Sequence, residues 1–218
     1  LVRWSMKQED TKQRILEKAL ELFSNRGYDA VSVGEIASAV GIKAASLYNH
    51  YSGKQAIFDA IVEKSVERYE KFAESMDVHL QNVERDTGVF ASIDADTLAD
   101  KVRAIFLYTL HDETVGRFRR MMSIEQFRSP DLAQLYSERY YDRLVRYHTG
   151  IFRALISDGV IEDYDPESLA VMYISAVITL LGVCDRQPER EAECLEKLKN
   201  HVVLFYRTYN AVHEEQHN

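Results

Sequence analysis

Residues 41–58, GIKAASLYNHYSGKQAIF, gather side chains that can donate hydrogen bonds to an anion. The donors are Ser46, Tyr48, Asn49, His50 and Lys54. The whole chain carries a formal net charge of −8, so this concentration of donors in one short segment requires an explanation. If these side chains share one exposed face, an anion is the partner that they would suit.

The composition of the 218 residues indicates a globular and mainly helical protein. Hydrophobic residues make up 46%, and 9 glycines with 3 prolines are too few for a turn-rich sandwich or barrel. Residues 1–58 hold 8 Lys and Arg against 6 Asp and Glu, a net +2, whereas residues 59–218 hold 19 against 29, a net −10. A basic head on an acidic body favours a polyanion-binding N-terminal end.

Apolar spacing and capping residues predict an all-α chain of about nine helices. Gly27 is expected to end the first helix, Ser32 and Glu35 form a capping box, and Gly41 supplies a turn. Residues 77–96 are expected to be a helix tail and a loop, with Asp96 or Thr97 capping the next helix. The expected helices cover residues 11–26, 33–40, 44–51, 54–76, 98–110, 116–127, 132–157, 166–186 and 190–212.

Residues 169–184, LAVMYISAVITLLGVC, contain no charged side chain and require comparison with a membrane span. As a helix they would reach about 24 Å, which is shorter than the roughly 30 Å hydrocarbon layer. We therefore expect a helix buried on most sides, in a core or a subunit interface. Cys184 and Cys194 match no metal or disulfide spacing, and residues 1–14 contain no apolar signal core, so a reducing, cytoplasmic setting is expected.

The pair of short helices around Gly41 has the layout of a helix-turn-helix. Ile36, Ala37, Val40 and Leu47 would hold the second helix against the first, leaving its other face free to enter a DNA major groove. Helix-turn-helix geometry also occurs in proteins that do not bind DNA, so this layout alone leaves both possibilities open.

Residues 11–58 resemble the N-terminal domain of the TetR family of transcriptional regulators. The matching residues are Ile15, Ala19, Phe23, Gly27, Tyr28, Ile36, Ala37, Gly41, Leu47, Tyr48, His50, Tyr51, Lys54 and Phe58. The resemblance implies a DNA-binding domain at residues 1–56 and a helical ligand-binding and dimerisation domain at residues 57–218.

The resemblance also assigns roles to individual residues. It places Tyr48, His50 and Lys54 on phosphates, with Ser46 in place of the usual threonine, and it puts Lys43, Ala44 and Ala45 nearest the bases. The full set expected to contact DNA is Lys43, Ala44, Ala45, Ser46, Tyr48, Asn49, His50 and Lys54. Lys43 occupies a cap position where serine or threonine is usual, so a capping bond is expected to be absent.

Two such heads on a two-fold dimer would bind a palindromic operator in double-stranded DNA. Residues 195–212 repeat apolar side chains at steps of three and four, so the last two helices are the expected interface, as in the family. The residues expected there are Leu169, Tyr173, Ala176, Leu180, Leu195, Leu198, Val202, Phe205 and Tyr209. The alternative is that both helices complete the core of a monomer.

A chamber for a small, mostly apolar or aromatic effector is expected between the head and the interface. Its expected lining is Phe106, Tyr108, Met121, Met122, Phe127, Tyr140, Tyr147, Phe152, Met172 and Tyr173, although for any single one of them ordinary core packing is the commoner explanation. Because repression is the commoner behaviour in the family, the resemblance implies a repressor that its effector releases from DNA.

The sequence has no nucleophile elbow, phosphate-binding glycine loop or zinc signature, so no catalytic residue, cofactor or metal site is expected. His111, Asp112 and Glu113 are adjacent and would point about 100° apart on a helix, which disfavours a shared metal. Arg117, Arg119 and Arg120 are expected to form a solvated face. The alternative function is an all-α small-molecule-binding protein or enzyme with a vestigial DNA-binding head.

Overall fold

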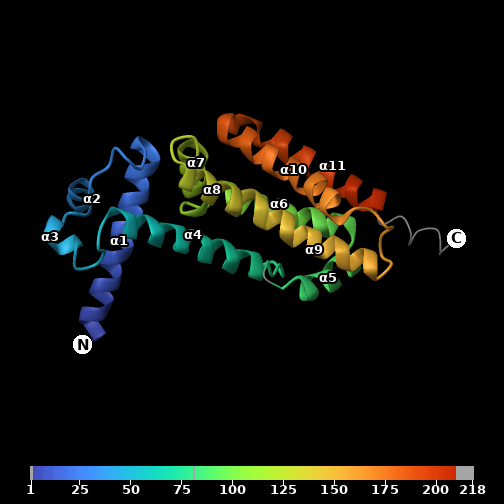
Figure 1. Ribbon diagram of the computed structural model, residues 1–218, viewed down its shortest axis with the longest axis horizontal. Helices are drawn as coiled ribbons and strands as arrows, with labels where there is room; N and C mark the ends of the chain where they lie inside the picture. Colours follow the sequence, from blue (N-terminus) through green and yellow to red (C-terminus); the bar gives the residue numbers. More distant parts are fainter. Residues whose placement is uncertain (1, 81, 210–218) are drawn as a thin grey trace. The chain divides into compact units, whose positions relative to one another are not determined.

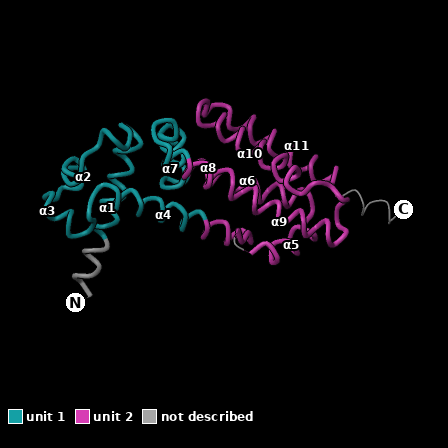
Figure 2. Tube along the Cα trace, in the orientation of Figure 1, with its two compact units in different colours: residues 1–69, 112–133 teal, residues 70–111, 134–218 magenta. Residues whose placement is uncertain are grey.

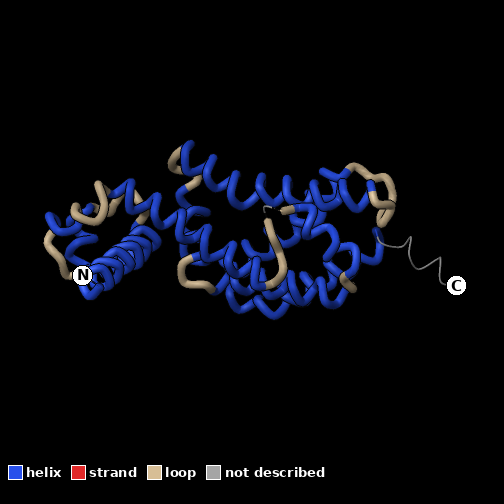
Figure 3. The backbone as a smooth tube through the Cα atoms, turned by 90° about the horizontal axis from the view of Figure 1, so that it is seen from below, coloured by secondary structure: helices blue, strands red, loops and turns tan. Residues whose placement is uncertain are grey.

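The computed structural model describes residues 2–80 and 82–209, which form helices joined by loops and no strand (Figures 1 and 3). This confirms the expected all-α fold class. The α-helices are α1 (Val2–Arg26), α2 (Val33–Val40), α3 (Ala44–Leu47), α4 (Lys54–Ser75), α5 (Val83–Ser92), α6 (Ala95–His111), α7 (Val115–Glu125), α8 (Pro130–Ser137), α9 (Arg143–Ser157), α10 (Pro166–Arg186) and α11 (Glu191–Tyr209). A π-helical turn, η1 (Glu138–Asp142), joins α8 to α9, and a 3₁₀ turn, η2 (Pro188–Arg190), precedes α11.

The chain divides into two compact units, each built from two segments (Figure 2). Unit 1 comprises Leu1–Tyr69 and Asp112–Ala133, and unit 2 comprises Glu70–His111 and Gln134–Asn218. Helix α7 therefore belongs to the same unit as α1, α2 and α3, although more than forty residues of unit 2 precede it in the chain.

Unit 1 is organised around the apolar stripe of α1, on which Ile15, Ala19 and Phe23 are buried. The capping box that starts α2 is present as expected: Glu35 N–H donates to Ser32 Oγ over 3.3 Å, and Ser32 N–H donates to a Glu35 carboxylate oxygen over 2.8 Å. Gly41 ends α2 in the left-handed region, with φ of 79°, which is the turn expected there.

Gly27 ends α1 in the same left-handed conformation, with φ of 83°, in which a residue with a side chain is strained. A Cβ atom there would lie 2.6 Å from an Arg128 nitrogen and 2.9 Å from a Glu125 carboxylate oxygen. Glu125, on α7, is buried and pairs with Arg128 at 3.1 Å. A side chain at residue 27 would therefore require the ends of the Arg128 and Glu125 side chains to shift.

Helices α5, α6, α9, α10 and α11 build unit 2 around two apolar clusters. The larger cluster joins α9, α10 and α11 through the rings of Phe152, Tyr173 and Phe205. The smaller cluster contains Phe106 and Leu198 with both cysteine side chains. Helix α5 was not expected. Its cap is Asn82, whose side chain accepts from Arg85 N–H over 3.0 Å, and this ten-residue helix contains a glycine, Gly88, in its middle, which made a loop the expected structure.

Several boundaries differ from the expected ones. Helix α1 begins at Val2 rather than at residue 11, because the positions before Ile15 at helical spacing, Lys12 and Thr11, are polar and the apolar stripe used to place the boundary stops there. Helix α6 is capped by Asp94, and neither Asp96 nor Thr97 caps it: the Asp94 carboxylate accepts from Thr97 N–H over 2.9 Å. The expected helix over residues 132–157 is interrupted by the η1 turn, and Val212 of the expected last helix lies outside the described residues.

Helix α10 starts as expected, with Asp165 accepting from Ser168 N–H over 2.8 Å and Pro166 in the first turn. By length and composition it is apolar enough to cross a membrane, a property that core helices share. Only 28% of its most apolar stretch is buried inside the chain, so the expectation of burial on most sides is not met within one subunit. Leu169, Tyr173 and Ile174 face the core, whereas Met172 is exposed.

His148, on α9, predicts a pH dependence of stability. Its Nδ1 lies 2.8 Å from the Leu144 carbonyl oxygen, its ring contacts the rings of Tyr147 and Tyr173, and burial lowers its pKa to about 4. A histidine with a lowered folded-state pKa must stay neutral, so its contribution is complete above about pH 6.5 and is lost towards pH 4. We expect unfolding free energy to fall by about 3 kcal/mol across that window.

Urea unfolding at several pH values measures this effect. His148→Gln should flatten the profile between pH 6.5 and 4. Equal profiles for wild type and His148→Gln would contradict the assignment.

Candidate DNA-binding surface

The short helix α3 is held against α2 by one fully buried side chain, that of Leu47. Helix α2 is in turn tied to α1: Arg14 donates to the Val40 carbonyl oxygen over 2.5 Å, and Arg26 pairs with Glu35 at 2.7 Å. Capping, burial and these two bonds therefore fix the angle at which α3 leaves the unit. This is the geometry that a helix-turn-helix requires.

The face of α3 opposite Leu47 points to solvent. Lys43, Ala44 and Ala45 are exposed, Tyr48 is 56% exposed and Asn49 is exposed, while Ser46 is half-buried. The helix is shorter than the expected 44–51, because after Leu47 the backbone tightens to i→i−3 bonds, such as His50 N–H to the Leu47 carbonyl oxygen at 2.8 Å. The face therefore continues beyond the α-helix in turns.

Lys43 stands at the N-cap of α3 without a side-chain capping bond, as the sequence indicated. His50 is half-buried, and its Nδ1 is buried without a hydrogen-bond partner among the described residues. Lys54, the eighth residue expected on DNA, is half-buried at the first position of α4, and its ammonium donates to backbone carbonyl oxygens. These last two side chains are thus less available to a partner than Tyr48 or Asn49.

Within residues 111–113, Asp112 has a structural role. Asp112 caps α7 by accepting from the N–H groups of Thr114 and Val115 over 3.0 and 2.9 Å. Arg68 donates to both oxygens of the same carboxylate over 3.2 and 2.5 Å, and its hydrogen bonds help to lower the pKa of Asp112 although burial opposes them. The described residues contain no group of three or more His, Cys, Asp or Glu that could hold a metal ion. Arg119, which was expected on a solvated face, is buried.

The ten residues expected to line an effector chamber do not converge. Met121 and Met122 are buried in unit 1, while Tyr147, Phe152 and Tyr173 lie in the larger cluster of unit 2 and Phe106 in the smaller one. Tyr108 stacks on Phe72 with ring centroids 3.9 Å apart, and Tyr140 is half-buried beside Tyr136. Phe127 is 86% exposed and Met172 52% exposed, so neither side chain lines an enclosed space within unit 1 or unit 2.

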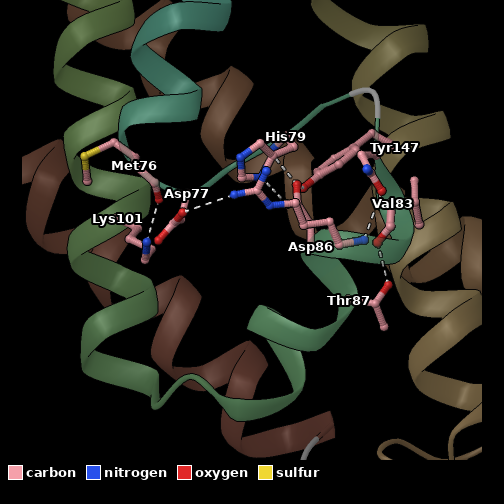
Figure 4. A network of polar contacts seen from close by, with 10 residues as sticks. Met76, Asp77, His79, Val83, Asp86, Thr87, Lys101 and Tyr147 are labelled. Atoms are coloured by element: carbon pink, nitrogen blue, oxygen red, sulfur yellow. Dashed lines mark hydrogen bonds and ion pairs between the residues drawn. The ribbon is translucent and has the colours of Figure 1, made fainter.

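A polar network that the sequence did not predict fastens the loop between α4 and α5 (Figure 4). Its centre is Asp86, a buried carboxylate that accepts from His79 N–H over 2.6 Å, from His79 Nδ1 over 2.8 Å and from Tyr147 Oη over 2.5 Å. Lys101 ties the same loop by donating to the Met76 carbonyl oxygen over 2.5 Å.

A pocket of about 230 Å³ adjoins this loop, and none of the ten expected residues lines it. The network could have been inferred from one signal. Asp86 shares a helix face with Val83 and Phe90, and an acidic residue within an apolar stripe indicates a buried hydrogen-bonded carboxylate.

The residues expected at a dimer interface lie mostly inside the subunit. Leu169, Tyr173, Leu198, Val202 and Phe205 are buried in the clusters of unit 2, so their side chains have little area left for a partner. The heptad-like seam of α11 is thus the contact between this helix and its own core. Ala176, Leu180, Leu195 and Tyr209 are half-buried, and Met172 on α10 and Leu204 on α11 are exposed.

The arrangement defines an all-α helix-turn-helix protein. Residues 15–61 match the model of a family described as bacterial regulatory proteins, tetR family. The match covers the N-terminal segment that contains α2 and α3, and in this segment the chain is similar to that family.

One individual protein with a similar N-terminal segment is a transcriptional regulator. The negative transcriptional regulator IcaR of the biofilm operon icaADBC, from Staphylococcus epidermidis, is 44% identical over 52 residues, which are 24% of this chain and 28% of IcaR. The match therefore spans less than a third of that relative.

Two solved structures are similar over nearly the whole chain. The SmeT–triclosan complex has a TM-score of 0.65 at 22% identity and covers 92% of both chains, and SmeT is the repressor of the Stenotrophomonas maltophilia efflux pump SmeDEF. The TetR-family regulator PfmR of Thermus thermophilus has a TM-score of 0.58 at 25% identity and covers 89% of this chain and 94% of its own.

Proposed function

We propose that the protein is a transcriptional repressor that binds double-stranded DNA through the exposed face of residues 43–50. The observation that carries this proposal is the solvent-facing set of Lys43, Tyr48 and Asn49, which flank the short helix α3 on the side opposite its fully buried Leu47. Such a face suits phosphate oxygens and the edges of bases in a major groove. The similarity to IcaR, a negative regulator, supports repression.

Recognition of a palindromic operator requires two heads, and we propose that a homodimer supplies them through α10 and α11. The support is the outward side of these helices: Met172 is 52% and Leu204 67% exposed, and most of α10 is apolar yet unburied. We therefore propose that Met172 and Leu204 face the partner subunit. Leu198, Val202 and Phe205, which were expected to do so, pack inside their own subunit.

We further propose that a small, mostly apolar or aromatic effector binds in unit 2 and releases the protein from DNA. The similarity to SmeT, which was solved with triclosan bound, supports an effector of this kind. By linkage, an effector that weakens DNA binding must itself bind more weakly to the DNA complex, by the same factor. A compound that binds but leaves DNA affinity unchanged is not that effector.

Fluorescence anisotropy with a duplex from the region upstream of the protein's own gene tests the DNA-binding proposal. The wild type should bind with an affinity that falls steeply with salt concentration. Tyr48→Ala should weaken binding about tenfold or more, because hydrogen bonds to charged groups contribute about 1.5–3 kcal/mol each. Tyr164→Ala, at a tyrosine that is 43% exposed in unit 2, is the matched control and should bind like wild type.

Two outcomes would count against the proposal. The absence of any salt-dependent duplex binding would leave the small-molecule-binding alternative, and equal affinities for Tyr48→Ala and wild type would remove α3 as the contact surface. Sedimentation of the same samples without DNA should give a dimer, and Leu204→Glu should shift it towards monomer.

A further inference from the structure

The ammonium group of Lys54 is surrounded by protein. Its Nζ donates to the carbonyl oxygens of Tyr28 and Asp29 over 2.9 and 3.4 Å, and it lies 4.4 Å from the centroid of the Tyr28 ring. An ammonium has three N–H donors, and here two carbonyl oxygens and one aromatic face account for its surroundings. This charge is therefore already satisfied before any DNA is bound.

Lys54 lies at a position of its helix where a positive charge is unfavourable. Lys54 is the first residue of α4, and a cation at a helix N-terminus is disfavoured by the helix dipole. The side chain turns back to two carbonyl oxygens in the loop that follows α1, where a cation is favoured. The contact thus compensates for an unfavourable helix position.

A second bond runs parallel to this contact. Tyr28 Oη donates to the Gln55 side-chain oxygen over 2.8 Å, and Gln55 is itself held by Asp59 at 2.8 Å. The Tyr28 ring packs between Phe23 and Phe58 with centroid distances of 5.2 and 5.1 Å. The loop after α1 and the first turn of α4 are consequently joined at three points around one ring.

These contacts join the two ends of the segment that contains the helix-turn-helix. Residues 28 and 54 are the two ends of the segment that contains α2 and α3, and joining them closes that segment into a loop. A segment whose two ends are also joined by side-chain bonds has fewer orientations available to α3 than one held only by the chain and by the bonds between α1 and α2. Lys54 therefore adds to the bonds of Arg14 and Arg26 a further constraint on the angle at which Tyr48 and Asn49 are presented.

We propose that Lys54 is a positioning residue that locks the helix-turn-helix closed through Tyr28 and Asp29, and that it is not one of the phosphate contacts. This inference rests on the proposed DNA-binding function and revises the role that the family resemblance gave to Lys54. Lys43, which is exposed at the N-cap of α3, is the matched lysine whose charge remains free.

The salt dependence of binding to a non-specific 30-bp duplex separates the two roles. Each phosphate contact contributes about 0.9 to the slope of log affinity against log salt concentration. Lys43→Met should reduce the slope by about 0.9 for each head, whereas Lys54→Met should keep the wild-type slope and weaken binding by a constant factor at every salt concentration. A slope for Lys54→Met that falls as it does for Lys43→Met would overturn the proposal.

Hydrogen exchange in the free protein provides a test without DNA. In Lys54→Met, the amides of residues 43–50 should exchange about tenfold faster than in wild type, and Lys54→Arg, which keeps a cationic donor, should restore most of the protection. Exchange unchanged in Lys54→Met would also overturn the proposal. If no variant binds duplex DNA, the proposed function fails, while the exchange measurement still decides whether Lys54 positions α3.

Discussion

Replacing Phe118 with alanine is expected to lower the free energy of unfolding by about 3–5 kcal/mol, although Phe118 lies far outside the N-terminal family match. Its side chain is fully buried, its ring lies 6.1 Å from that of Phe58, and α7, which carries it, packs on α1. Truncation would leave a cavity beneath the head, so duplex DNA binding should also weaken as the fraction of folded protein falls.

Urea unfolding measures the effect, with Phe127→Ala as the matched control. Phe127 is two residues beyond the end of α7 and is 86% exposed, so the same substitution should change stability by no more than about 0.5 kcal/mol. If Phe118→Ala and Phe127→Ala proved equally stable, the assignment of α7 to the core of unit 1 would be wrong.

Asp86→Ala is expected to cost about 3–5 kcal/mol in unit 2, because removing one member of a buried polar group leaves its partners unsatisfied. Two donors of His79 and the Tyr147 hydroxyl would lose their acceptor at once. The loop between α4 and α5 should then become accessible to proteases, since these bonds fasten it (Figure 4).

Asp163→Ala, at an exposed aspartate of the same unit, should remain within about 0.5 kcal/mol of wild type. A double-mutant cycle adds a stricter criterion: Tyr147→Phe should cost less in the Asp86→Ala background than in wild type, because the hydroxyl no longer has an acceptor to lose. Strictly additive effects would show that Asp86 and Tyr147 do not interact.

The N-terminal segment with α1, α2 and α3 could be predicted well from short-range sequence patterns. The capping box of Ser32 and Glu35, the left-handed glycines 27 and 41, and the buried Leu47 are each set by neighbours within a few residues. The body was harder to predict, because its elements are stabilised by partners distant in sequence. Helix α5 is held by Tyr147, which lies 61 residues from Asp86, and although Asp86 on the face of Val83 and Phe90 indicates a buried carboxylate, nothing within α5 identifies Tyr147 as its partner.

In the candidate DNA-binding surface, too, features set by neighbouring residues could be predicted and features set by distant residues could not. The exposure of Tyr48 and Asn49 follows from helical spacing around Leu47, so it could be predicted. The engagement of Lys54 with Tyr28 could not, because it spans 26 residues and depends on how α1 meets α4. The apolar seam of α11 was assigned to a partner subunit, since periodicity identifies a buried face without saying which surface buries it.

Because unit 1 takes α7 from the middle of the chain, a protein of this design cannot be divided at a single peptide bond. A chimaera that joined residues 1–69 to a foreign body would leave Phe58 facing an unrelated surface in place of Phe118. Exchange of binding specificity between such proteins must therefore transplant α7 together with the head, through three junctions.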